Sequence, residues 1–95
     1  MLHIVLTDNA KLTLQHLFDR VEYRFGATIA DEFLEKVEKV LRQVAQNPEM
    51  FKTVPFLKNV RIAFVSKKTA FYYQINKQDL ILLYFWDNRQ EPLFD

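Results

Sequence analysis

Apolar residues in the first quarter of the chain follow two different spacings. Residues 2–6 (LHIVL) form a short apolar run rich in β-branched residues, which predicts a strand. Through residues 10–25 the apolar positions recur at three- and four-residue steps, which predicts an amphipathic helix. These positions are Ala10, Leu14, Leu17, Val21 and Phe25. Thr7 or Asp8 would cap the start of this helix, and Gly26 would close it in a left-handed conformation.

A second amphipathic helix is predicted after Gly26. Its apolar seam consists of Ala30, Phe33, Leu34, Val37, Val40, Leu41 and Val44. The opposite side carries three acid–base pairs at i,i+4 spacing, which is typical of a solvated face. Thr28 and Asp31 have the form of a capping box at its start. Asn47-Pro48 would end the helix, because the residue before a proline is disfavoured in the α conformation. The short link predicts an antiparallel helical hairpin.

Three strand-like runs follow a connecting loop at residues 49–58. Alternating patterns predict strands in residues 59–66 (NVRIAFVS) and 70–76 (AFYYQIN). Residues 80–86 (LILLYFW) are apolar throughout, as expected for a central strand that is covered on both faces. The predicted order is β-α-α-β-β-β within a single domain over residues 1–95. We therefore expect a two-layer α+β fold, with the helical hairpin packed on a small, mostly antiparallel sheet.

The composition of the chain excludes several classes of protein but does not by itself identify a function. Hydrophobic residues make up 49% and charged residues 26% of the chain, which excludes a disordered protein. No cysteine is present, and His3 and His16 lack the spacing of metal ligands, so we expect no metal site. A single glycine argues against a phosphate-binding loop, and no cofactor is expected. No apolar run is long enough to cross a membrane, which favours a cytoplasmic protein.

The remaining candidate residues for chemistry gather on the three C-terminal strands and their ends. They are Arg61, Lys67, Lys68, Tyr72, Tyr73 and Arg89. Because Arg61 alternates with Val60 and Ile62, its side chain should point to the opposite side of the sheet. Cleavage of RNA without a metal requires cations to hold the phosphate, together with a base and an acid. The arginines supply the first requirement, whereas packing is the favoured role of both tyrosines.

The order and spacing of several features resemble the RelE/ParE family of type II toxin–antitoxin toxins over nearly the whole chain. They are a first helix opened by Ala10 and ended by Phe25-Gly26, a helix closing at Asn47-Pro48, Val60-Arg61, the FYYQI strand at 71–75, and DNRQEP at 87–92. The resemblance implies the same β-α-α-β-β-β fold. It also implies a cognate antitoxin, encoded nearby, with which the chain would form a hetero-oligomer.

The resemblance implies a different target for each branch of the family. RelE-like members cut messenger RNA on the ribosome, with basic residues on the central strands, an arginine after the last strand and a tyrosine near the C-terminus. ParE-like members lack that set and inhibit DNA gyrase. Here Arg89 matches the post-strand arginine, but Ala70 replaces a central-strand arginine, and Leu93 or Phe94 stands where the tyrosine would fall.

These departures favour a ParE-like gyrase inhibitor. A ribosome-dependent ribonuclease using Arg61 and Arg89, and an inactive family member, remain the alternatives. The residues expected to contact the target or the antitoxin are Arg61, Lys67, Lys68, Tyr72, Trp86 and Arg89.

Overall fold

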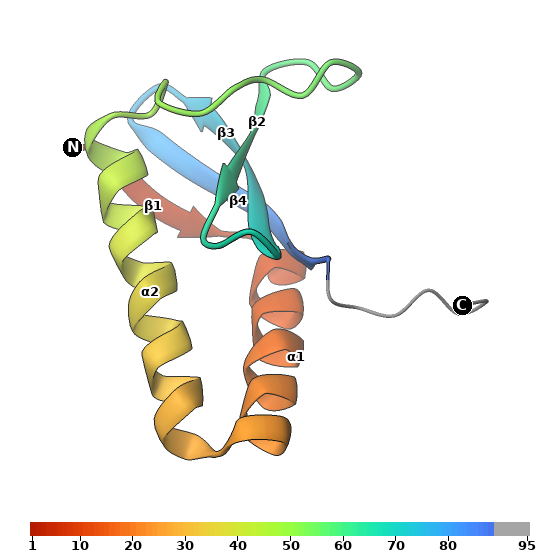
Figure 1. The fold of residues 1–95 in the computed structure, drawn as a ribbon. Coiled ribbons are helices and arrows are strands. Elements are labelled where there is room, and N and C mark those ends of the chain that lie inside the picture. The colour runs from red at the N-terminus through yellow and green to blue at the C-terminus, as the bar shows by residue number, and fades with distance from the viewer. Residues whose placement is uncertain (89–95) are drawn as a thin grey trace.

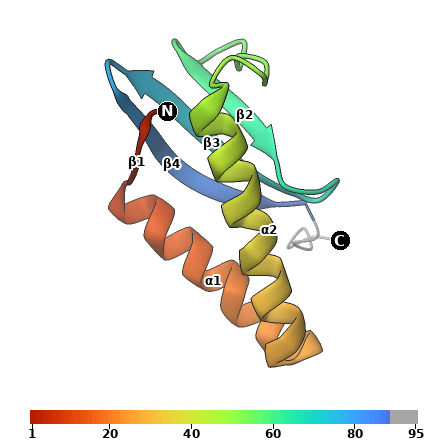
Figure 2. The ribbon, with the colours of Figure 1, turned by 90° about the vertical axis from the view of Figure 1, so that its left-hand side faces the viewer.

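The computed structural model describes residues 1–88. The elements are β1 (His3–Leu6), α1 (Asp8–Phe25), α2 (Ala27–Gln46), β2 (Val60–Phe64), β3 (Thr69–Asn76) and β4 (Asp79–Asp87). The strands form one sheet in the order β1-β4-β3-β2, in which β1 is parallel to β4 and the other pairs are antiparallel. Both helices lie on one side of this sheet (Figures 1 and 2). The predicted two-layer α+β fold is confirmed.

The helical hairpin turns on one glycine. The Thr7 hydroxyl caps α1 by accepting a hydrogen bond from the Ala10 amide, as predicted. Gly26 has φ = 92°, a region that favours glycine, and it forms both the end of α1 and the start of α2. The predicted capping box is therefore wrong. Since α2 already begins at Ala27, Thr28 lies inside its first turn, and no side chain caps this helix.

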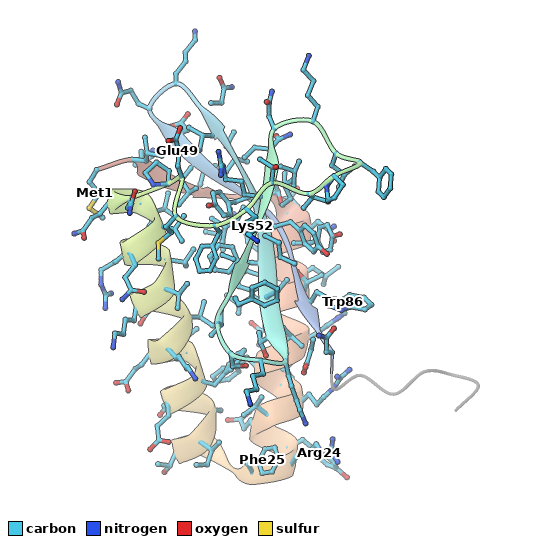
Figure 3. All side chains as sticks on the ribbon, turned by 45° about the horizontal axis from the view of Figure 1, so that its top comes forward. Met1, Arg24, Phe25, Glu49, Lys52 and Trp86 are labelled. Carbon is cyan, nitrogen blue, oxygen red and sulfur yellow. The ribbon has the colours of Figure 1, made fainter. Side chains whose placement is uncertain are left out.

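The core lies between the helices and the sheet. It contains Leu17 from α1, Val37, Leu41 and Val44 from α2, and Phe71, Tyr73, Leu80, Leu82 and Phe85 from the two central strands. The Phe71 ring packs against both Tyr73 and Phe85, with ring centroids 6.0 and 5.4 Å away. The tip of the hairpin, with Arg24 and Phe25, projects well beyond the sheet (Figure 3). No helix within residues 1–88 is long and apolar enough to cross a membrane.

Two threonines of the first helix region complete the edge of β4. The strand β1 ends opposite Leu82, so the following part of β4 has no strand beside it on that edge. The Thr7 hydroxyl donates to the Leu83 carbonyl oxygen at 2.9 Å, and the Phe85 amide donates to the Thr13 hydroxyl at 2.8 Å. Leu83 also sits at an irregularity in the pairing of β3 with β4. The helix thus fixes the segment that leads to Trp86.

The apolar run of β4 is not covered on both faces, contrary to expectation. Its central position between β1 and β3 is as predicted. Leu80, Leu82 and Phe85 are buried against the helices, but Trp86 on the opposite face is 48% exposed. No helix or second sheet within residues 1–88 covers that opposite face, as the two ribbon views show. The run is apolar because one of its faces builds the core and the other forms a bare surface.

Candidate functional site

The surface of interest is the side of the sheet that faces away from the helices, here called the open face. The strand register places eleven residues of the three antiparallel strands on it, because side chains alternate along each strand. They are Val60, Ile62 and Phe64 on β2, Ala70, Tyr72, Gln74 and Asn76 on β3, and Asp79, Ile81, Tyr84 and Trp86 on β4. Eight of these eleven side chains are apolar or aromatic. A face of this composition is suited to contact with another macromolecule.

Four aromatic rings gather at one end of the open face. Phe64, Ala70 and Trp86 stand opposite one another in the first row of the register, and Ile62, Tyr72 and Tyr84 form the next row. We call Phe64, Tyr72, Tyr84 and Trp86, with Ala70 between them, the aromatic patch. Phe64 is 49% and Trp86 48% exposed, whereas Ala70 is only 3% exposed. The small side chain of Ala70 lies shielded between two large rings that face solvent.

The second row is ordered by a ring stack. Tyr72 and Tyr84 have centroids 4.6 Å apart and planes inclined by 22°, which is a stacked arrangement. Partial burial, reinforced by the neighbouring Tyr72, raises the pKa of the Tyr84 hydroxyl above its ordinary value. The raised pKa favours the protonated form of the Tyr84 hydroxyl, which lies beside the Tyr72 hydroxyl in the stack.

The position of Trp86 is held by the segment that follows β4. Its indole Nε1 donates to the Oδ1 atom of Asn88 at 2.8 Å, and the Asn88 amide donates to the Lys68 carbonyl oxygen at 2.6 Å. On the other side of the sheet, buried Asp87 forms an ion pair with Arg20 of α1 at 3.9 Å. The indole points outward from the end of β4 (Figure 3). These contacts hold a large exposed ring in place before any partner binds.

Arg61 does not belong to the open face. It pairs with Tyr73, whose ring is fully buried on the helix side, so its side chain lies on that side too. Its Nη1 atom donates to the Phe51 carbonyl oxygen at 2.6 Å. The Tyr73 hydroxyl donates to the Pro48 carbonyl oxygen at 2.7 Å. Burial raises the pKa of Tyr73, and nearby Arg61 offsets part of that shift. Both side chains anchor the loop after α2.

The predicted site residues therefore separate into three groups. Tyr72 and Trp86 lie together on the open face, and Lys67 and Lys68 are exposed in the turn between β2 and β3, next to the aromatic patch. Arg61 lies on the opposite side of the sheet. Arg89, like Leu93 and Phe94, falls outside the described residues. The structure thus brings together an aromatic surface with a basic end, and it separates this surface from Arg61.

Sequence reasoning overlooked Phe64, Ala70 and Tyr84 as parts of a surface. The sequence did contain a signal for Phe64. It lies two residues after Ile62, so both side chains point to the same face of the strand. What the sequence lacked was the pairing register, which brings Phe64 and Trp86 to either side of Ala70. Among residues 1–88, no group of three or more histidine and carboxylate side chains is arranged to hold a metal ion.

Two helices packed on one side of a four-stranded sheet define a small α+β domain. The family described as the ParE toxin of the type II toxin–antitoxin system parDE matches residues 4–92. The chain belongs to this family. Membership implies an antitoxin as partner.

Solved structures with this fold include several toxins. A chain of the chromosomal ParDE system from P. aeruginosa is 13% identical with a TM-score of 0.77, covering 92% of this chain and 96% of that chain. YafQ from E. coli is 10% identical with a TM-score of 0.64, covering 94% and 96%. A copper-bound mutant toxin from Helicobacter pylori is 20% identical with a TM-score of 0.60, covering 95% and 98%. At these identities the likeness concerns the fold alone. No curated protein matches the sequence.

Proposed function

We propose that this chain is a ParE-like toxin that acts in the cytoplasm by binding and inhibiting DNA gyrase, and that its antitoxin neutralises it. The observation that carries the proposal is the chemistry of the open face. Where the resemblance would place an arginine of a ribonuclease, Ala70 lies shielded between Phe64 and Trp86. A surface of exposed, pre-positioned aromatic side chains is typical of protein–protein contact.

The placement of Arg61 supports binding over RNA cleavage. A ribonuclease would need its cations, base and acid around one phosphate. The Arg61 side chain is bonded to Phe51 on the helix side, and the sheet separates it from Tyr72 and Tyr84. Tyr84 has a raised pKa and remains protonated at neutral pH, so it supplies no base.

A gyrase assay tests the proposal directly. Purified toxin added to gyrase and relaxed plasmid should reduce supercoiling, and induced expression should block replication and induce the SOS response. Trp86→Ala should weaken the inhibition by about tenfold or more, as expected for a large aromatic side chain in a binding contact. Phe56→Ala is the matched control, because Phe56 is 94% exposed but lies in the loop before β2, outside the aromatic patch.

Other outcomes would identify the alternatives. Codon-phased cuts in translated transcripts, mapped by primer extension and lost in Arg61→Ala and Arg89→Ala, would establish the ribonuclease and refute the proposal. Unchanged growth after expression without antitoxin, with no effect on supercoiling, would indicate an inactive family member.

We further propose that the antitoxin covers apolar side chains of the helical hairpin. A groove of about 350 Å³ is lined by Leu6, Lys11, Leu14, Gln15, Phe18 and Leu34. Such a groove suits the apolar face of an amphipathic helix. Phe18→Glu should release the antitoxin in a co-purification assay. The charge reversal Glu22→Lys, at an exposed position of the same helix, should not release it. Retention of the antitoxin by Phe18→Glu would contradict this location.

A further inference from the structure

Charge is distributed unevenly between the two layers of the protein. Residues 52–88, which hold β2, β3 and β4, contain six Lys or Arg and two Asp or Glu, so their net charge is +4. Asp87 and the Arg61 side chain both lie on the helix side of the sheet and cancel, so the remaining residues of this segment also have a net charge of +4. Residues 1–51 have a net charge of −2. A macromolecule that approaches the sheet therefore meets a positive field, which favours an acidic partner.

The positive charge closest in sequence to the aromatic patch comes from a single turn. Lys67 and Lys68 connect the strand that carries Phe64 to the strand that carries Ala70. Both lysines are exposed, and neither forms an ion pair within 4.0 Å in the described part of the chain. The carbonyl oxygen of Lys68 is bonded to Asn88, which in turn holds the Trp86 indole. Hydrogen bonds through Asn88 thus connect the basic turn and the Trp86 ring into one unit.

We propose that this unit docks an acidic segment of the toxin's target protein. A large apolar side chain of the segment packs on Phe64 and Trp86, and carboxylates beside it pair with Lys67 and Lys68. The inference rests on the proposed function insofar as the target is a protein that binds the open face. It adds the chemistry of the recognised segment: one bulky apolar side chain with acidic residues next to it.

The observations favour a protein segment over a single-stranded nucleic acid. Binding of a single strand needs free aromatic faces for successive bases and a basic groove along the backbone. Tyr72 and Tyr84 are stacked on each other, so each ring already has one face occupied. The lysines lie at one end of the patch and do not line it. This arrangement matches an apolar centre with a charged rim, as in protein interfaces.

Trp86 makes the test direct, because it is the only tryptophan in the chain. The probe is a synthetic 12-residue peptide without tryptophan, with Leu-Phe at its centre and glutamates on both sides. Titration of this peptide into the full chain should shift the Trp86 fluorescence and saturate. Two matched peptides replace either the glutamates by lysines or Leu-Phe by Ala-Ala, and both should bind at least about tenfold more weakly.

Variants assign the contact. The double variant Lys67→Glu, Lys68→Glu and the variant Phe64→Ala should each weaken binding of the acidic peptide by about tenfold or more. Phe56→Ala and Lys77→Glu, at exposed positions away from the patch, should leave it unchanged. Circular dichroism and thermal unfolding verify that each variant is folded. Binding that is insensitive to the double charge reversal in a folded protein would overturn the proposal.

Two further results would overturn it. The first is tighter binding of an oligothymidine than of the acidic peptide, which would indicate a nucleic acid. The second is no fluorescence change with the acidic peptide up to millimolar concentration. A different result would show that the proposed function is wrong while the docking site is right. If the acidic peptide binds the patch but supercoiling by gyrase is unaffected, the docking site stands and gyrase is not the target.

Discussion

Tyr72 and Tyr73 are adjacent in the sequence but occupy opposite environments. The Tyr72 ring is partly exposed on the open face, stacked on Tyr84, whereas Tyr73 is fully buried and bonded to the Pro48 carbonyl oxygen. The difference follows from strand geometry, because successive side chains point to opposite faces. One tyrosine thus packs in the core and hydrogen-bonds to a loop, whereas its neighbour contributes a ring to the surface.

Removal of the Tyr73 hydroxyl should destabilise the fold at neutral pH. Tyr73→Phe leaves the Pro48 carbonyl oxygen without this donor, and we expect the free energy of unfolding to fall by about 1–2 kcal/mol. Urea denaturation at pH 7 measures the change. Tyr23→Phe, at a ring that is 92% exposed, is the control and should have no measurable effect.

The same residue predicts a loss of stability in alkali. Burial raises the pKa of Tyr73 in the folded state above its ordinary value of 10.0, so the unfolded chain loses this proton first. The free energy of unfolding should therefore be constant with respect to this group below pH 10 and fall as the pH rises beyond it. Tyr73→Phe should reduce this slope above pH 10, measured by urea denaturation. An equal slope in both proteins would contradict the assignment.

At the scale of elements, most of the fold could be predicted from the spacing of apolar residues. Both helices and all four strands were expected close to where they lie. The capping box was misread because Thr28 and Asp31 fit a local pattern, while Gly26 alone makes the turn between the helices. The bare face of β4 was misread because an apolar run looks the same whether a layer of the protein covers it or none does. The start of α2 and the coverage of β4 both depend on parts of the chain outside the local pattern.

Two threonines that look alike in the sequence should differ in their effect on stability. Thr7→Ala removes the cap of α1 and the bond to the Leu83 carbonyl oxygen, and should cost about 1–2 kcal/mol. Thr28→Ala removes no capping bond, and should change the free energy of unfolding by less than about 0.5 kcal/mol. Parallel thermal unfolding of the two variants checks this. Equal losses of stability in the two variants would indicate that Thr28 does cap α2.

A side chain at the glycine between the helices should destabilise the fold. An added Cβ at Gly26 meets no atom within 4 Å, so the cost of Gly26→Ala is purely conformational. At φ = 92° we expect a loss of about 1–3 kcal/mol. Ala27→Ser, at the next position, provides a control with normal backbone geometry. Chemical denaturation of both variants measures the difference.

At the scale of the whole molecule, the sheet divides the candidate residues. Alternation correctly turned Arg61 away from Val60 and Ile62, but the sequence alone did not reveal that the helices occupy that side. The sequence predicted Tyr72 and Trp86 as contact residues but not the rest of the surface around them. Exposure and pairing register could not be predicted, because they depend on contacts between distant segments. Phe64 and Ala70 could be assigned to it only once β2, β3 and β4 were aligned.

This division predicts that one substitution cannot make the chain a ribonuclease. Ala70→Arg would place a guanidinium on the open face, yet Arg61 would remain bonded to Phe51 behind the sheet. We expect no ribosome-dependent cleavage by Ala70→Arg in a primer-extension assay on translated transcripts. The same variant should lose gyrase inhibition, because the new side chain disturbs Phe64 and Trp86. Codon-phased cleavage would show that the two faces act together.

The position of β4 also has a consequence for synthesis. The strand is the last of the four in chain order but stands second in the sheet, between β1 and β3. Translation proceeds from the N-terminus, so β1 must wait for residues 79–87 before it has a neighbour. The aromatic patch also lacks Tyr84 and Trp86 until then. A nascent chain therefore carries no complete aromatic patch until residues 79–87 have been synthesised and paired.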